Sequence, residues 1–285
     1  MEYQNRLPPE GINVSRVHPL KQFVQLAIGA LILVIIVVVI LQLTGSLLAK
    51  RIPFSFETAV MNRLDIPFGD DGRSPEMTSY LNELAGRLSQ QMKLPEGMRV
   101  TVHYDDEDVF NAYATVGGHL LFYKGLLDRM PDENTLAMVM AHEISHVLHR
   151  DPVASLGGGV VSTIALLGLT GSSGMAGQVL NNAGMITSMQ FTRKMEEAAD
   201  EQALMALNSL YGHVAGAPRL FELFSESRAD AESGNAAWLE RFLSTHPRDE
   251  DRISQIARQA ERQQWEIEGE LTPLPDDFER WLGDT

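Results

Sequence analysis

The chain has 285 residues, of which 44% are apolar and 21% are charged, and these values are typical of a folded globular protein. It contains no cysteine, which excludes disulfides, thiolate zinc sites and a cysteine nucleophile. The formal net charge is −15, and all of the excess negative charge follows residue 49, so we expect no nucleic-acid partner.

The first predicted element is a transmembrane helix over residues 22–49, which follows a polar tail at 1–21. No charged residue occurs between Lys21 and Lys50, and about 20 apolar residues suffice to cross a bilayer as a helix. A cleaved signal peptide would have a shorter apolar region of roughly 7–15 residues. The numbers of basic residues on the two sides of the span are nearly equal, so the positive-inside rule does not decide the orientation. The short amino-terminal flank favours a cytoplasmic amino terminus, with the following domain outside the cytoplasm.

Residues 50–75 are rich in proline and glycine and are expected to form a linker with the first contacts of the domain. The domain itself is predicted at 76–265. Apolar residues at helical spacing predict a helix over 77–92, and alternation predicts a strand over 99–104. The segments 111–115 and 119–123 flank Gly117-Gly118 and are typical of a β-hairpin.

The next predicted helix opens at Pro131-Asp132-Glu133, ends near Arg150 and carries the sequence His142-Glu143-Ile144-Ser145-His146. Positions four apart lie on one face of an α-helix, one turn from each other. His142 and His146 can therefore bind one zinc ion, and Glu143 is placed to act as the general base of a metallopeptidase.

Three segments complete the chain. Residues 154–177 are apolar and rich in glycine, and two interpretations stay open. One is a mobile loop with a short core helix, and the other is a flap over the active site or a contact with the membrane surface. Residues 188–210 are predicted to be helical, and helix is expected to continue to about residue 265. Residues 266–285 form an acidic tail.

A catalytic zinc ion usually has three protein ligands, so a third is needed. Glu196 and Asp200 are four apart on the predicted 188–210 helix, and Glu196 could ligate zinc while Asp200 accepts the second N–H of a ligand histidine. Glu197 and Glu201 offer a competing register on the same helix. The spacing alone leaves this choice open.

Together, these residues resemble family forty-eight of the membrane-linked zinc metallopeptidases, which includes the CAAX prenyl endopeptidases and the HtpX-type, BepA-like and Oma-like proteases. Its H-E-x-x-H motif is followed by E-x-x-A-D, which matches Glu196-x-x-Ala199-Asp200. Asn111-Ala112-Tyr113-Ala114 resembles the family's hairpin before the zinc helix. Thr245-His246-Pro247 with Arg252-Ile253 resembles a later family segment. One departure is Asp151, where many BepA-like members have a further histidine.

The resemblance implies an α+β, mostly helical, gluzincin-like domain with a small sheet or hairpin beside the zinc helix. The transmembrane helix predicted above precedes this domain. The resemblance also implies one Zn²⁺ per chain, held by His142, His146 and Glu196, with Asp200 orienting a ligand. It implies that His246 lies near the zinc as a catalytic residue. Residues Asn111, Ala112, Tyr113 and Ala114 are expected to bind the substrate.

We therefore predict a membrane-anchored zinc endopeptidase that hydrolyses unfolded or misassembled envelope proteins. The single anchor places it closest to the BepA-like branch, in the bacterial inner membrane with the catalytic domain in the periplasm. The alternative is a membrane-tethered chaperone or assembly factor with a latent protease site. A structural zinc protein is less consistent with the residues, because such sites usually have four closed ligands, often cysteines. The oligomeric state is not indicated by the sequence.

Overall fold

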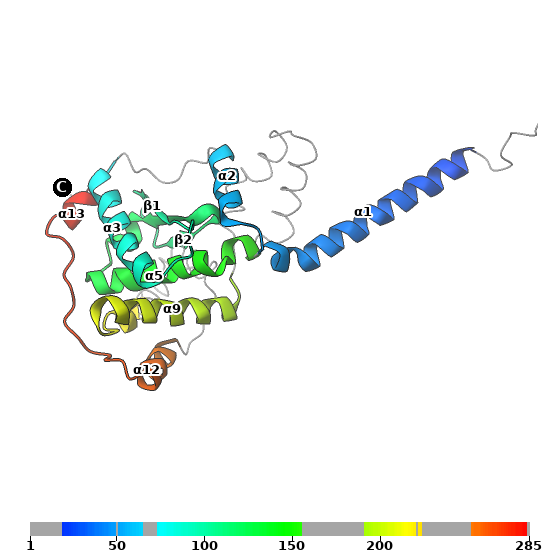
Figure 1. Ribbon diagram of the computed structural model, residues 1–285. Helices are drawn as coiled ribbons and strands as arrows, with labels where there is room; N and C mark the ends of the chain where they lie inside the picture. Colours follow the sequence, from blue (N-terminus) through cyan, green and yellow to red (C-terminus); the bar gives the residue numbers. More distant parts are fainter. Residues whose placement is uncertain are drawn as a thin grey trace, which may run out of the picture.

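The computed structural model describes residues 19–49, 51–64, 73–155, 191–220, 222–223 and 252–283. Its helices surround a small sheet, and α1 extends away from the rest (Figure 1). The helices are α1 (Pro19–Ala49), α2 (Phe54–Leu64), α3 (Pro75–Gln91), α4 (Lys124–Leu127), α5 (Glu133–His149), α9 (Arg193–Tyr211), α12 (Arg252–Gln263) and α13 (Phe278–Trp281), with a 3-10 turn, η1, at Val116–Gly118. The strands are β1 (Thr101–Asp105), β2 (Ala112–Ala114) and β3 (His119–Tyr123).

The sheet has three strands in the order β1-β3-β2. β3 pairs antiparallel with β2 and parallel with β1, so the predicted hairpin is confirmed. The outer edge of β1 is covered by α3, because the side-chain amide of Asn82 donates to the carbonyl of Val102 at 2.7 Å and accepts its N–H at 2.9 Å. β2 therefore lies at the opposite edge of the sheet within the described residues.

Helix α5 runs through the centre of the domain, between the sheet, α3 and α9 (Figure 1). Every residue from Glu133 to Val147 is buried, so the helix has no solvent-facing side over that length. Asp132 caps its amino terminus, where the carboxylate accepts the N–H of Thr135 at 2.7 Å. Arg150 caps its carboxyl terminus in the left-handed conformation, with φ 63°. The predicted bounds of this helix are confirmed.

The carboxyl-terminal segment packs along the domain beyond α12. The backbone of Thr272 accepts the N–H of Glu133 at 2.9 Å and donates to the side chain of Asn134 at 2.7 Å. Phe278 is buried with its ring edge-on to Tyr80 at 5.9 Å between centroids. The predicted acidic tail at 266–285 is thus attached to the amino-terminal end of α5 through Thr272 and to α3 through Phe278.

The prediction of a mostly helical α+β fold with a small sheet or hairpin is confirmed, and the sheet is mixed. The linker prediction at 50–75 did not include α2, which packs on η1. Among the residues that the structure describes, no helix combines the length and apolar character needed to cross a membrane. Most of the glycine-rich segment at 154–177 lies outside the described residues.

Candidate active site

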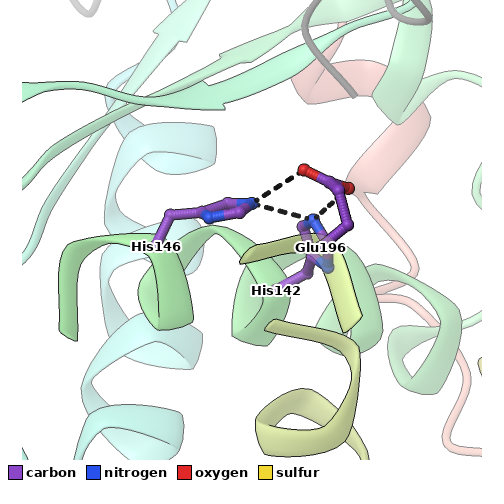
Figure 2. Close-up of side chains that lie close together, drawn as sticks. All are labelled: His142, His146 and Glu196. Atoms are coloured by element: carbon purple, nitrogen blue, oxygen red, sulfur yellow. Dashed lines mark hydrogen bonds and ion pairs between the residues drawn. The ribbon is translucent and has the colours of Figure 1, made fainter. Parts of the chain in front are cut away.

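Three side chains from two helices converge at the middle of α5 (Figure 2). The Nε2 atoms of His142 and His146 are 3.1 Å apart, as expected for adjacent turns of one helix face. From α9, Glu196 places its Oε2 atom 3.4 Å from Nε2 of His142 and its Oε1 atom 3.4 Å from Nε2 of His146. All three side chains are buried. They form the only group of metal-binding residues found within the described parts of the chain.

Each histidine ring is oriented by a carboxylate at its other nitrogen. The Nδ1 atom of His142 lies 2.9 Å from Asp200 Oδ1, and the Nδ1 atom of His146 lies 3.1 Å from Asp151 Oδ2. The ring of His146 also stacks on Phe191, with 3.9 Å between centroids and 14° between planes. Carboxylates in these positions fix the tautomer, because Nδ1 donates its hydrogen and Nε2 keeps its lone pair free for a metal.

The position of Glu196 follows from how α9 begins. Thr192 caps the helix by accepting the N–H of Met195 at 3.4 Å, which places Glu196 in the first turn. A negative side chain is favourable there because of the helix dipole. The competing register is not used, since Glu197 and Glu201 are exposed on the other side of the helix.

Arg252 at the start of α12 joins the two acidic groups of α9. Its Nε donates to Asp200 Oδ2 at 2.7 Å, a second guanidinium nitrogen pairs with Asp200 Oδ1, and a third contact reaches Glu196 Oε2 at 3.5 Å. The two contacts between the guanidinium and the carboxylate of Asp200 hold that carboxylate in one orientation. Arg252 therefore positions the residue that orients His142.

The acidic residues around the site favour a positive charge on the two imidazoles. Burial lowers the pKa of His142, but hydrogen bonds and attraction from Asp200 and Glu196 outweigh it and raise that pKa to about 10. His146 has its pKa raised in the same way, against burial, by Asp151 and Glu196. Burial raises the pKa of Asp200, but Arg252 and His142 hold it below its usual range.

The donor set fits zinc. Two imidazole nitrogens and one carboxylate oxygen are the ligands of many catalytic zinc sites. Tetrahedral ligands at about 2.0–2.1 Å from zinc are separated from each other by roughly 3.3–3.4 Å. The two Nε2 atoms are 3.1 Å apart, and each lies 3.4 Å from one oxygen of Glu196, Oε2 for His142 and Oε1 for His146. Each pair of side chains therefore brings donor atoms to about the separation that a zinc site requires, and one donor atom from each of the three residues lies within 4.8 Å of the others.

The structure describes all of the other predicted site residues except His246. Glu143 is buried on α5, directly after His142. Residues Asn111, Ala112, Tyr113 and Ala114 are buried in and just before β2, and β2 packs against α5. His246 lies outside the described residues.

Two contacts of His146 were missed from the sequence. Asp151 was noted only as a departure from the family pattern, and Phe191 was not considered. Asp151 lies five positions after His146, which is not a helical-face spacing, and it reaches the ring only because the chain turns at Arg150. In the sequence, the only sign of the contact between Asp151 and His146 is an acidic residue between the predicted end of the helix and Pro152.

The sequence pattern of peptidase family M48 matches residues 74–260, which include the whole site. The chain belongs to this family. Its metallopeptidases use zinc, so the predicted family, enzyme class and cofactor are confirmed at the level of the family. The CAAX, HtpX, BepA and Oma group named from the motifs is therefore the correct one.

Two relatives show which kinds of protease the chain is similar to. The chain is 30% identical over 182 residues to a mitochondrial metalloendopeptidase OMA1 of Schizosaccharomyces pombe, covering 63% of this chain and 52% of the relative. It is 27% identical over 200 residues to a β-barrel assembly-enhancing protease of Escherichia coli, covering 65% of this chain and 39% of the relative. The chain thus spans about half or less of the length of these M48 relatives.

Proposed function

We propose that this M48 chain is a membrane-anchored zinc endopeptidase that hydrolyses unfolded or misassembled proteins of the cell envelope. The observation that carries the proposal is the convergence of His142, His146 and Glu196, with Glu143 next to one of the ligands. His142, His146 and Glu196 would hold one zinc ion. When bound, zinc lowers the pKa of water towards neutrality and polarises the carbonyl of the scissile bond.

The residues of the chain supply the remaining steps. Glu143 accepts a proton from the attacking water and delivers it to the leaving amine. Asp200 and Asp151 keep the two imidazoles in the tautomer that presents Nε2. His246 is proposed to stabilise the oxyanion, a role that rests on the family resemblance.

The hairpin supports a substrate of extended conformation. β2 lies at an edge of the sheet and packs against α5, the helix that carries two of the ligands. An extended polypeptide that adds to such an edge is held by backbone hydrogen bonds, which give affinity with little sequence preference. A protein must be locally unfolded to present such a strand, so Asn111–Ala114 would select unfolded substrates.

The proposal predicts a clear preference between two states of one substrate. We expect the full chain with zinc to cleave a reduced, permanently unfolded test protein at least about tenfold faster than its native, disulfide-bonded form, because only the former can extend along β2. Gel densitometry over time measures both rates. Equal rates for the two forms would contradict the role of the edge strand.

Membrane attachment is the second part of the proposal. The uncharged stretch between Lys21 and Lys50 is longer than the roughly 20 residues that a spanning helix needs. The β-barrel assembly-enhancing protease among the relatives also suits an envelope location, since such barrels reside in outer membranes. We propose a single pass in the bacterial inner membrane, with the catalytic domain in the periplasm.

Truncation tests the anchor. We expect the full chain to remain in the membrane pellet after a carbonate wash, and a chain that lacks residues 1–50 to move to the supernatant, because the truncation removes the continuous apolar segment between Lys21 and Lys50. Immunoblotting of the two fractions measures the distribution. A truncated chain that stays in the pellet would point to residues 154–177 as a second membrane contact.

A further inference from the structure

Helix α2 contributes a buried charge to the end of the zinc helix. It directly follows α1 and lies outside residues 74–260, which the family pattern matches. In Figure 1, α2 (light blue) stands beside the sheet near the carboxyl-terminal end of α5. Its only acidic residue, Glu57, is 5% exposed. A buried carboxylate needs partners that offset the loss of its hydration.

Glu57 has a partner at each carboxylate oxygen. One oxygen forms an ion pair with the guanidinium of Arg150, and the other accepts the N–H of Gly117 at 3.1 Å. Gly117 has φ 81° and belongs to the turn between β2 and β3. Glu57 therefore joins α2 to the end of α5 and to the hairpin turn at once.

Arg150 is held by the same segment through further contacts. It donates to the carbonyl of Ile52 at 2.7 Å, and its guanidinium lies 5.6 Å from the centroid of the Phe54 ring. The side chains of Arg150 and Glu57 are 12% and 6% exposed, so this ion pair is largely removed from water. Removing one partner of a buried pair leaves the other charge uncompensated, which distinguishes this pair from a surface ion pair.

The backbone of Arg150 determines where Asp151 lies. Its φ of 63° and ψ of 30° are in the left-handed region, which glycine usually occupies at helix ends because a Cβ atom is unfavourable there. This turn ends α5 and brings the next residue, Asp151, back to within 3.1 Å of His146 Nδ1. The contacts of the guanidinium stabilise a backbone conformation that arginine does not favour by itself.

We propose that Glu57 and Arg150 form a clamp by which the segment after the anchor positions Asp151, and through it the His146 ring. The inference rests on the proposed assignment of His146 as a zinc ligand. The clamp residues do not touch the metal or the substrate, and they act as positioning residues. Loss of the clamp lets Asp151 move away from Nδ1, and the affinity of His146 for zinc falls.

Two substitutions separate the clamp from a general packing role. Glu57→Gln removes the charge that faces Arg150 but keeps an amide oxygen for the Gly117 N–H. Arg150→Met removes the guanidinium but keeps a Cβ atom and an unbranched side chain in the left-handed turn, so the turn loses the contacts that stabilise it. Asp106→Asn is the matched control, because it breaks an exposed ion pair between Asp106 and Arg73 that lies in another part of the domain.

The readout is the rate at which zinc leaves the full chain, purified in detergent, into an excess of a coloured chelator. We expect Glu57→Gln and Arg150→Met each to release zinc about three- to tenfold faster than the parent, somewhat less than the effect of losing a direct partner of a ligand. The double variant should release it no faster than the single ones, because both remove the same clamp. Asp106→Asn should match the parent.

Thermal unfolding of the same variants completes the test. If Glu57→Gln lowers the melting temperature while both variants keep the parent's zinc release rate, the clamp is only a packing element and the inference is wrong. Additive rates in the double variant would also overturn it. A parent chain that binds no zinc contradicts the proposed metal site itself, so the two failures are distinguishable.

Discussion

Replacement of Glu143 by glutamine is expected to abolish peptide hydrolysis while the chain keeps its zinc. Glutamine has nearly the same shape but cannot accept the proton of the attacking water. General-base catalysis contributes about 10²- to 10⁴-fold, so the hydrolysis rate should fall by that factor. The zinc-to-protein ratio should stay that of the parent, because Glu143 is not among the three residues that converge on the metal position.

The measurement pairs a cleavage time course with metal analysis of the same samples. Glu197→Gln is the matched control, since Glu197 is an exposed glutamate on α9 near the site. That variant should cleave at the rate of the parent. A Glu143→Gln chain that still cleaves at more than a tenth of the parent rate would remove Glu143 from its role as the base.

Replacement of Glu196 by alanine should act on the metal itself. It removes one of the three side chains that lie within 4.8 Å of one another at the site. Loss of an orienting residue outside the ligand set typically costs about 10- to 100-fold in metal affinity, so loss of a ligand should cost more than about 100-fold. Zinc competition with a chelator of known affinity measures the change.

The zinc affinity of Glu196→Ala is compared with the affinities of two further variants, Asp200→Asn and Glu197→Ala. Asp200→Asn should weaken zinc binding by about 10- to 100-fold, because the amide no longer attracts the Nδ1 hydrogen of His142 as a carboxylate does. Glu197→Ala, on the exposed face of α9, should leave the affinity unchanged. Equal affinities in Glu196→Ala and Glu197→Ala would show that Glu196 is not a ligand.

The parts of the site that were predicted from sequence share a regular spacing. His142 and His146 are separated by one helical turn, and so are Glu196 and Asp200, so each pair had to share a face once its helix was recognised. Spacing could not choose between Glu196 and Glu197, because that choice depends on which side of α9 meets α5. The family resemblance favoured Glu196, and the structure buries it.

The contacts that were missed have no such regularity. Asp151 reaches His146 only through a left-handed turn at an arginine, a conformation that residue type does not predict. Helix α2 was hidden in a segment read as a linker, because Pro53 and Pro67 flank its eleven residues. The Glu57–Arg150 ion pair, which links α2 to the end of α5, joins positions far apart in the sequence.

Hydrolysis of an unfolded protein by the full chain should be measured before zinc removal, after chelation and after zinc is restored. We expect cleavage to stop when the metal is removed, and to return when about one zinc ion per chain is bound again. Cleavage that persists in the chelated chain, or a chain that binds one zinc ion through His142, His146 and Glu196 and cleaves nothing, would contradict the assignment as a zinc endopeptidase.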